Sequence, residues 1–380
     1  MANLKFQGAQ VLTPAGLHVS DLTIEGQWIA DSGGRPVDLT GYLVLPGIVD
    51  LHGDGFERHL APRRGAMKQM AEGLVATEAE LAANGITTAV LAQFVSWEGG
   101  LRGLDFADQV FAAIRDTRAG LVTDIRAQLR FETHQLELYP DLPQRVAAWD
   151  VTYVVFNDHL PHDRLSAGRQ PPRMVGQALK AGRNPEKHFA LMMEAHARRD
   201  EVPGALDTLC AALAARGIRM GSHDDHTAEI RQRWHGRGVT VAEFPETEEA
   251  AHAAQDMRDP VILGAPNVVR GASHKGNVSA RALVEKGLCD ALASDYHYPS
   301  PRRAAFALAE GPGMDLARAW RLVSEGPARV LGLTDRGTLA PGQRCDLVVI
   351  DVATQRVAAT MVAGQFSYLS GPVAERFFAS

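Results

Sequence analysis

Histidine and carboxylate residues recur in this sequence directly after short apolar runs of strand-like composition. Imidazole and carboxylate are the groups that bind Zn²⁺, Mn²⁺ or Fe²⁺ in proteins, whereas imidazole disfavours Mg²⁺. His52 and Asp54 lie two positions apart, so on an extended segment both side chains point to the same side and can grip one ion. We therefore predict a centre for one or two divalent metal ions, with Zn²⁺ or Mn²⁺ favoured and Fe²⁺ as a third option. The predicted ligands are His52, Asp54, Glu132, His159, His223 and Asp295.

Two carboxylates compete for one place in this centre. Glu132 is the candidate for a carboxylate that bridges two ions. Glu243 is either an alternative ligand or a residue that positions one of the ligands. The sequence alone does not separate these two roles. In either case water bound to such a metal loses its proton more readily, with a pKa of about 7 on zinc, so the predicted chemistry is hydrolysis.

A further group of residues suits an anion. Residues 266–277 follow the seventh apolar run and combine cationic and amide side chains with glycines, which let backbone N–H groups approach oxygen atoms closely. Arginine offers a fork of donors and lysine a point charge. Phosphate sites are also frequent after the late strands of a barrel. The predicted substrate contacts are Asn267, Arg270, Ser273, His274, Lys275 and Asn277, with Arg63 and Arg64 adding charge.

The alternative for these basic residues is a solvated surface, because charged side chains are mostly exposed. The spacing is not that of a P-loop. His274 or His226 is a candidate to protonate or orient a leaving group, although neither is tied to a strand end by spacing.

Eight strand-like runs, several of them followed by a helical stretch, must position these residues. Strands that alternate with helices indicate a parallel sheet, and eight such units fit an α/β fold of the (β/α)₈ barrel type, with working residues at the carboxyl ends of the strands. An open doubly wound sheet is the runner-up, but no G-x-G-x-x-G follows the first run. The expected strands cover residues 47–51, 86–91, 125–131, 151–156, 218–221, 239–244, 261–264 and 291–294.

The two chain ends have a different pattern of short strands separated by turns. Residues 1–45 and 336–380 are expected to form one small β-domain, since chain termini often lie close together. Residues 46–335 then form the barrel. A polar insertion rich in Pro and Gly, at about residues 160–188, is expected to be a lid or binding loop, with a solvated surface excursion as the alternative.

Composition excludes several classes of protein. With 46% hydrophobic and 22% charged residues among 380, the chain is typical of globular proteins. Three cysteines without a C-x-x-C exclude a disulfide scaffold and favour a reducing compartment. The net charge of −6 argues against nucleic-acid binding. Because the sequence starts without a signal-peptide pattern and its longest apolar stretch is too short for a bilayer, we expect a cytoplasmic protein with a small-molecule substrate and no membrane contact.

Two segments resemble the amidohydrolase superfamily. Residues 45–52 (LPGIVDLH) are similar to its first-strand signature, and residues 337–347 (GTLAPGQRCDL) to its return into a small β-domain. The resemblance implies a metal-dependent (β/α)₈ TIM-like barrel with a small β-sandwich domain built from both chain ends. It also implies that Asp295 orients the attacking water and accepts its proton. The superfamily usually has two histidines around one residue on the first strand, whereas here the second position is Asp54.

A more specific resemblance runs from about residue 43 to the C-terminus. It points to the phosphonate-utilisation branch of the superfamily and depends most on residues 264–277 (GAPNVVRGASHKGN). Shorter matches are HGD at 52–54, SHDD at 222–225, AEFP at 242–245 and SDY at 294–296. The resemblance implies hydrolysis of α-D-ribose 1-methylphosphonate 5-triphosphate to ribose 1-methylphosphonate 5-phosphate and diphosphate in the carbon–phosphorus lyase pathway. A homo-oligomer or other proteins of that pathway are the implied partners.

Two alternatives stay open. The superfamily more often hydrolyses amides or cyclic imides or deaminates bases, and a neutral substrate of that kind would not need the basic residues, because a shared fold does not fix the reaction. A barrel that has lost its metal and serves as a scaffold is the other alternative. The number of strand ends that still carry metal-binding side chains argues against it.

Overall fold

The fold is built on one sheet of eight parallel strands that nearly closes into a barrel. The computed structural model describes residues 3–61, 69–271, 278–311 and 313–378. Neighbouring strands follow the chain in order, and a parallel bridge between Gly53 and Asp295 brings the first strand beside the last. The strands are β8 (Ile48–Gly53), β9 (Ile86–Val95), β10 (Asp124–Glu132), β11 (Tyr153–Asn157), β12 (Arg219–His223), β13 (Val241–Glu243), β14 (Val261–Gly264) and β15 (Ala291–Ala293). All eight predicted strands are confirmed, and with them the fold class.

These segments form interior parallel strands because they are rich in apolar residues and are buried over most of their length. All ten residues of β9 are buried, as are all six of β8. Continuous burial of this kind is expected when both faces of a parallel sheet are covered. Gly47 precedes β8, and a side chain there would collide with Thr87 of β9, so the close approach of the two strands requires glycine.

Helices connect most of the strands. Threonine or asparagine side chains cap several of them by accepting hydrogen bonds from the first-turn N–H groups, as Thr227, Thr247 and Asn184 do. No helix among the described residues has both the length and the apolar character that crossing a membrane requires. The helices are α1 (Glu57–Leu60), α2 (Met70–Ala83), α3 (Leu104–Thr117), α4 (Leu142–Ala148), α5 (His162–Ser166), α6 (Met174–Lys180), α7 (Pro185–Ala197), α8 (Val202–Ala214), α9 (Ala228–Gly236), α10 (Glu248–Asp256), α11 (Ala265–Arg270), α12 (Ala280–Glu285), α13 (Ser300–Ala309), α14 (Leu316–Arg321), α15 (Glu325–Leu331) and α16 (Pro372–Phe378).

The polar insertion at about residues 160–188 is largely helical rather than an extended loop. It contains α5 and α6 and the first turn of α7. Its helices bury Leu165, Met174 and Met192 in a small core against Trp97. The Pro-rich composition concealed this structure, because Pro185 stands at the start of α7, where proline is tolerated.

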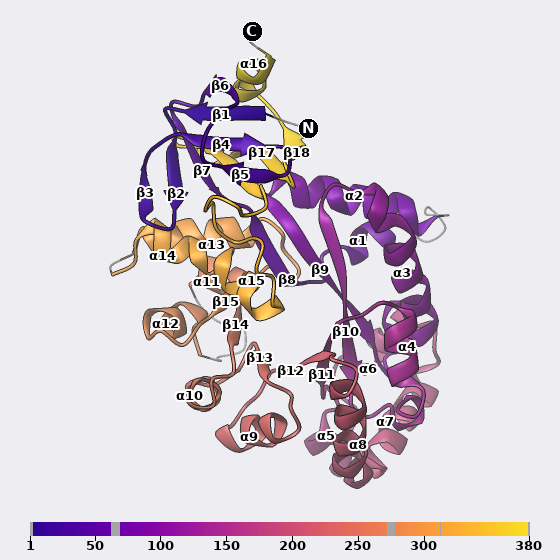
Figure 1. Ribbon diagram of the computed structural model, residues 1–380. Coiled ribbons are helices and arrows are strands. Elements are labelled where there is room, and N and C mark those ends of the chain that lie inside the picture. Colours follow the sequence, from indigo (N-terminus) through magenta and orange to yellow (C-terminus); the bar gives the residue numbers. More distant parts are fainter. Residues whose placement is uncertain (1–2, 62–68, 272–277, 312, 379–380) are drawn as a thin grey trace. The chain divides into compact units, whose positions relative to one another are not determined.

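Both chain ends contribute to a small β-domain, as predicted (Figure 1). One sheet has the order β5-β4-β1-β6 and a second the order β18-β17-β16-β7-β2-β3. Phe6, Val44 and Leu347 are fully buried in their common core. The strands are β1 (Asn3–Gln7), β2 (Gln10–Thr13), β3 (Gly16–Val19), β4 (Leu22–Glu25), β5 (Trp28–Ala30), β6 (Arg35–Asp38), β7 (Tyr42–Pro46), β16 (Leu347–Asp351), β17 (Val357–Val362) and β18 (Gln365–Leu369).

The chain comprises two compact units. The first contains residues 1–91, 117–126 and 262–380, and with them the small β-domain, β8 and β15. The second contains residues 92–116 and 127–261, and with them β11, β12, β13 and the helical insertion.

Candidate functional site

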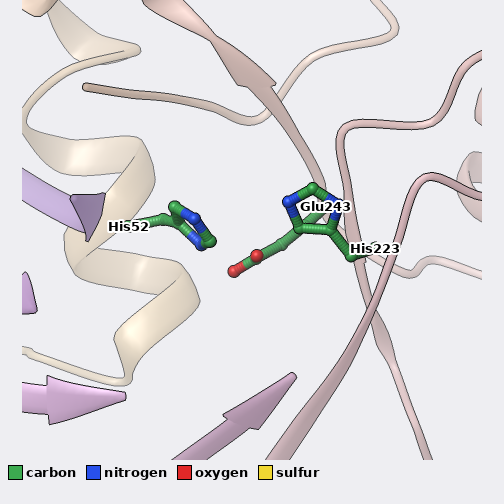
Figure 2. Close-up of side chains that lie close together, drawn as sticks. All are labelled: His52, His223 and Glu243. Carbon is green, nitrogen blue, oxygen red and sulfur yellow. The ribbon is translucent and has the colours of Figure 1, made fainter. Parts of the chain in front are cut away.

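His223 and Glu243 end two neighbouring strands, β12 and β13, and stand opposite each other in register. Figure 2 shows both side chains, together with that of His52 from β8 of the first unit. Glu243 is fully buried, and its Oε1 accepts hydrogen bonds from Gln128 Nε2 at 3.0 Å and from the Tyr153 hydroxyl at 2.5 Å. Ligand atoms of His223 and Glu243 lie within 4.8 Å of each other. The second unit thus presents an imidazole and a carboxylate in the combination that holds Zn²⁺ or Mn²⁺.

The surroundings of His223 determine which of its nitrogens is protonated. Arg130 Nη2 lies 3.0 Å from His223 Nε2, and because arginine has no acceptor, this nitrogen must accept the hydrogen bond. His223 Nδ1 lies 3.1 Å from Asp224 Oδ1, and a carboxylate at this distance favours a proton on Nδ1. Burial would raise the pKa of the Asp224 carboxyl, but the contacts with His223 and His159 have the larger effect and lower it. His223 thus has a lone pair on Nε2, as a metal ligand requires, and an ion there would take the place of the Arg130 contact.

Glu132 and His159, predicted as ligands on the third and fourth strands, contact each other. His159 Nδ1 lies against Glu132 Oε1, and the backbone N–H of His159 donates to Glu132 Oε2 at 3.2 Å. Burial would lower the pKa of His159, but hydrogen bonds to Asp224 and Glu132 prevail and raise it to about 9. Both oxygens of Glu132 therefore contact His159, whereas Gln128 and Tyr153 both donate to Oε1 of Glu243.

In the first unit the backbone joins the other three predicted ligands. The N–H of Asp295 donates to the carbonyl of His52 at 3.0 Å, and the N–H of Asp54 donates to the carbonyl of Asp295 at 2.9 Å. His52 is fully buried. These two hydrogen bonds hold the end of β8 beside the residues that follow β15.

Three residues that lie one or two positions beyond the last residue of a barrel strand adopt the left-handed conformation, which non-glycine residues rarely use. They are Asp224 (φ 62°), Phe244 (φ 53°) and Asp295 (φ 54°). Such strained positions cluster at functional sites. Aspartate tolerates this conformation, but nothing in the sequence marks Phe244 for it.

The predicted anion segment is only partly described. Residues 265–270 form helix α11, and the Arg270 guanidinium lies 5.4 Å from the centre of the Tyr296 ring. Asn267 lies on the same helix. The remaining predicted contacts lie outside the described residues, namely Arg63, Arg64, Ser273, His274, Lys275 and Asn277.

His226, the other candidate for handling a leaving group, has an exposed side chain. Its Nδ1 lies 2.8 Å from Glu246 Oε2, within hydrogen-bonding distance. The contact gives His226 a structural partner.

Sequence reasoning missed Gln128 and Arg130. Both precede Glu132 on β10 by an even number of residues, so alternation along the strand places all three side chains on one face. That spacing could have identified them once Glu132 was singled out.

Comparison with known proteins agrees with the barrel fold. The model of the amidohydrolase family matches residues 176–367. The sequence is also 34% identical over 320 residues to α-D-ribose 1-methylphosphonate 5-triphosphate diphosphatase of Escherichia coli, which covers 82% of this chain and 84% of that enzyme. The chain belongs to the amidohydrolase family. It is therefore a hydrolase, and the predicted resemblance is confirmed.

Other matches are less similar in sequence. Adenine deaminase of Sinorhizobium fredii is 25% identical over 365 residues, but this chain spans only about half of its length, 53%. Among solved structures, N-acetylglucosamine-6-phosphate deacetylase of Pasteurella multocida superposes with a TM-score of 0.63 at 12% identity, covering 96% of this chain and 99% of that one. The β-aspartyl dipeptidase of Fervidobacterium islandicum superposes with a TM-score of 0.62 at 15% sequence identity, and the superposition covers 98% of both chains. These two structures establish the fold alone.

Proposed function

We propose that this amidohydrolase cleaves the phosphoanhydride of α-D-ribose 1-methylphosphonate 5-triphosphate, giving ribose 1-methylphosphonate 5-phosphate and diphosphate. The observation that carries the proposal is the 34% identity to the Escherichia coli diphosphatase, because it extends over most of both chains. The basic segment after β14 supports it, since a neutral substrate would not need Arg270 and Lys275.

The metal centre of this reaction draws on histidines and carboxylates at the strand ends. We propose His52, Asp54, His223 and Asp295 as ligands, with Glu132 and His159 as further ligands on the neighbouring strands. The contacts within the second unit favour Glu243 over Glu132 as the carboxylate next to His223, because Glu132 is bound to His159 through both oxygens. When bound, a divalent ion such as Zn²⁺ or Mn²⁺ supplies a Lewis acid that makes water more acidic and offsets phosphoryl charge.

The chain's own residues bind the substrate, orient its leaving group and move a proton. A water oxygen forms a bond to phosphorus, the bridging P–O bond breaks, and diphosphate leaves. Asp295 accepts the proton of the attacking water. Arg270 and Asn267, together with Lys275 and Ser273, bind the phosphoryl oxygens and stabilise their charge. The same role is proposed for Arg63, Arg64 and Asn277, and His274 orients the leaving diphosphate.

The test is diphosphate release from the purified protein. We expect turnover of α-D-ribose 1-methylphosphonate 5-triphosphate when Mn²⁺ or Zn²⁺ is supplied, and loss of turnover after chelation. The products are distinguished by ³¹P NMR. Metal-loaded protein that leaves the triphosphate intact would refute the substrate assignment.

A second candidate is hydrolytic deamination of a base. The match to the adenine deaminase of Sinorhizobium fredii, which extends over 90% of this chain, favours it over other reactions of the family. Adenine incubated with the metal-loaded protein should release no ammonia under our proposal. Deamination of adenine without cleavage of the triphosphate would reverse the ranking of the two candidates.

A further inference from the structure

A second group of metal-binding side chains lies in the second unit and shares no residue with the predicted centre. His134 lies two residues beyond β10, Asp158 directly follows β11, and His162 opens helix α5. Ligand atoms of these three residues lie within 4.8 Å of one another. The segments that carry them are the ends of two barrel strands and the helical insertion.

The spacing of the ligand atoms suits a tetrahedral ion. Asp158 Oδ2 lies 3.3 Å from His134 Nε2 and 3.2 Å from His162 Nε2. Zinc bonds of 2.0–2.1 Å at the tetrahedral angle place neighbouring ligand atoms about 3.3 Å apart. A charge-assisted hydrogen bond is shorter, typically about 2.7–2.9 Å. Both separations therefore match the edge of a zinc site better than a tight ion pair.

A neighbouring histidine orients His162. Nδ1 of His162 lies 2.8 Å from Nδ1 of His196 on helix α7, so one proton is shared between these two nitrogens. His196 Nε2 lies 3.1 Å from Ser166 Oγ and can donate to it. With Nε2 of His196 directed to the Ser166 hydroxyl, Nδ1 of His196 can accept from Nδ1 of His162. Metal-binding histidines ordinarily have such a partner on the ring nitrogen that faces away from the ion.

Burial gives the group one closed and one open side. Only 3% of the His134 side chain is exposed, against 31% for His162 and 45% for Asp158. Among the described residues, His134 Nδ1 has no hydrogen-bond partner, so the polar contact of this buried ring is the one with Asp158. An ion can therefore enter from solvent and keep a water as its fourth ligand.

We propose that His134, Asp158 and His162 bind a divalent metal ion of the zinc class, and that His196 positions His162 for it. Two imidazoles and one carboxylate favour Zn²⁺ over Mg²⁺ or Ca²⁺. A bound ion ties α5 to the ends of β10 and β11 and so stabilises the insertion. The site is independent of the reaction proposed above, because none of its ligands takes part in that reaction.

The first test is zinc stoichiometry after equilibrium dialysis, measured by elemental analysis. His162→Gln and Asp158→Asn should each bind one zinc per chain fewer than the wild type. His252→Gln is the matched control, since His252 is an exposed histidine of the same unit paired with Glu248 on its own helix. It should keep the full zinc content. Unchanged zinc content in both cluster variants would overturn the proposal and leave the group as a simple ion pair.

A second test separates this site from the catalytic centre and does not depend on a variant of the cluster. Zn²⁺ should slow amide hydrogen exchange in α5 and α7 of the wild type, and Mg²⁺ should not. His223→Gln should retain this protection, because His223 belongs to the other centre. Exchange in α5 that is the same with and without Zn²⁺ would contradict the proposal.

Discussion

Asp50 and Ser294 lie 244 residues apart in the chain and are joined by two hydrogen bonds. The Ser294 hydroxyl donates to Asp50 Oδ2 at 2.5 Å, and its backbone N–H donates to Oδ1 at 2.9 Å. Both residues are fully buried. Burial raises the pKa of Asp50 despite the two donors. The pair connects β8 to the end of β15 and thereby fixes the backbone that carries His52 and Asp295.

Replacing Ser294 by Ala should therefore destabilise the fold. The fully buried Asp50 carboxyl loses a hydrogen-bond donor, which costs about 1–3 kcal/mol in the free energy of unfolding. Denaturant unfolding measures the change. Ser279→Ala is the control, because the Ser279 side chain makes no capping hydrogen bond at α12. A Ser294→Ala protein that unfolds at the wild-type midpoint would contradict this role of the pair.

Asp295→Asn should reduce diphosphate release by orders of magnitude and leave the fold intact. Asparagine cannot accept the proton of the attacking water, but it tolerates the left-handed conformation that Asp295 adopts. The hydrogen bonds of Asp295 to His52 and Asp54 use only the backbone and are kept. Steady-state turnover and the unfolding midpoint are the two measurements. The exposed Asp256→Asn serves as the control, and equal rates for the two variants would exclude proton transfer by Asp295.

Glu243→Gln and Glu132→Gln should differ in their effect on metal binding. Glu243 stands in register with His223, whereas Glu132 is bound to His159 through both oxygens. We expect Glu243→Gln to weaken binding at the His223 centre by at least about tenfold, since altering even a supporting residue of a metal site costs about 10–100-fold. Zinc titration monitored by competition with a chelator measures both affinities. The opposite order would assign the ligand role to Glu132.

Arg336 donates hydrogen bonds to two carboxylates of the first unit, those of Asp124 and Asp335. Its guanidinium donates to Asp124 at 2.6 Å, to Thr88 at 2.9 Å and to both oxygens of Asp335. Only 5% of its side chain is exposed. Arg336→Met should lower the free energy of unfolding by about 1.5–3 kcal/mol, because it removes charge-assisted hydrogen bonds to Asp124 and Asp335, while Arg126 still compensates Asp124. The exposed Arg216→Met is the control and should stay within about 0.5 kcal/mol of the wild type.

The effect of Arg336→Met should also depend on pH. Burial would raise the pKa of Asp124, but Arg126 and Arg336 outweigh it and hold the pKa below its usual value of 3.8. A carboxyl with a lowered pKa stabilises the folded state above the unfolded-state pKa and loses this contribution as the pH falls. The difference in unfolding free energy between wild type and variant should therefore be largest at neutral pH and shrink below about pH 4. A difference that grows on acidification would contradict the ion-pair role.

The three cysteines should be unreactive in the native protein. Burial raises the pKa of Cys210 to about 12 and raises the pKa values of Cys289 and Cys345 as well. The thiolate is the reactive form, so little of it is present at pH 8. Titration with a disulfide reagent should detect all three thiols in denaturant and almost none in the folded protein. A rapidly reacting native thiol would be inconsistent with this burial.

The sequence by itself determined the eight barrel strands, the β-domain at the chain ends and the positions of the histidines and carboxylates after the strands. These features follow from local patterns, because an apolar run and the polar residue that ends it are adjacent in the chain. Local patterns did not decide how the predicted ligands pair. Only the packing of β10, β11, β12 and β13 placed Glu243 opposite His223 and turned Glu132 toward His159.

The insertion and its histidines depended on tertiary structure to a greater degree. Its Pro- and Gly-rich sequence favoured a loop, but burial of Leu165 and Met174 against Trp97 stabilises helices there. Those helices bring His162 and His196 within hydrogen-bonding distance of each other and His162 beside Asp158. Asp158 and His162 are only four positions apart, but His162 and His196 lie 34 positions apart on separate helices, and only the folded chain fixes that distance.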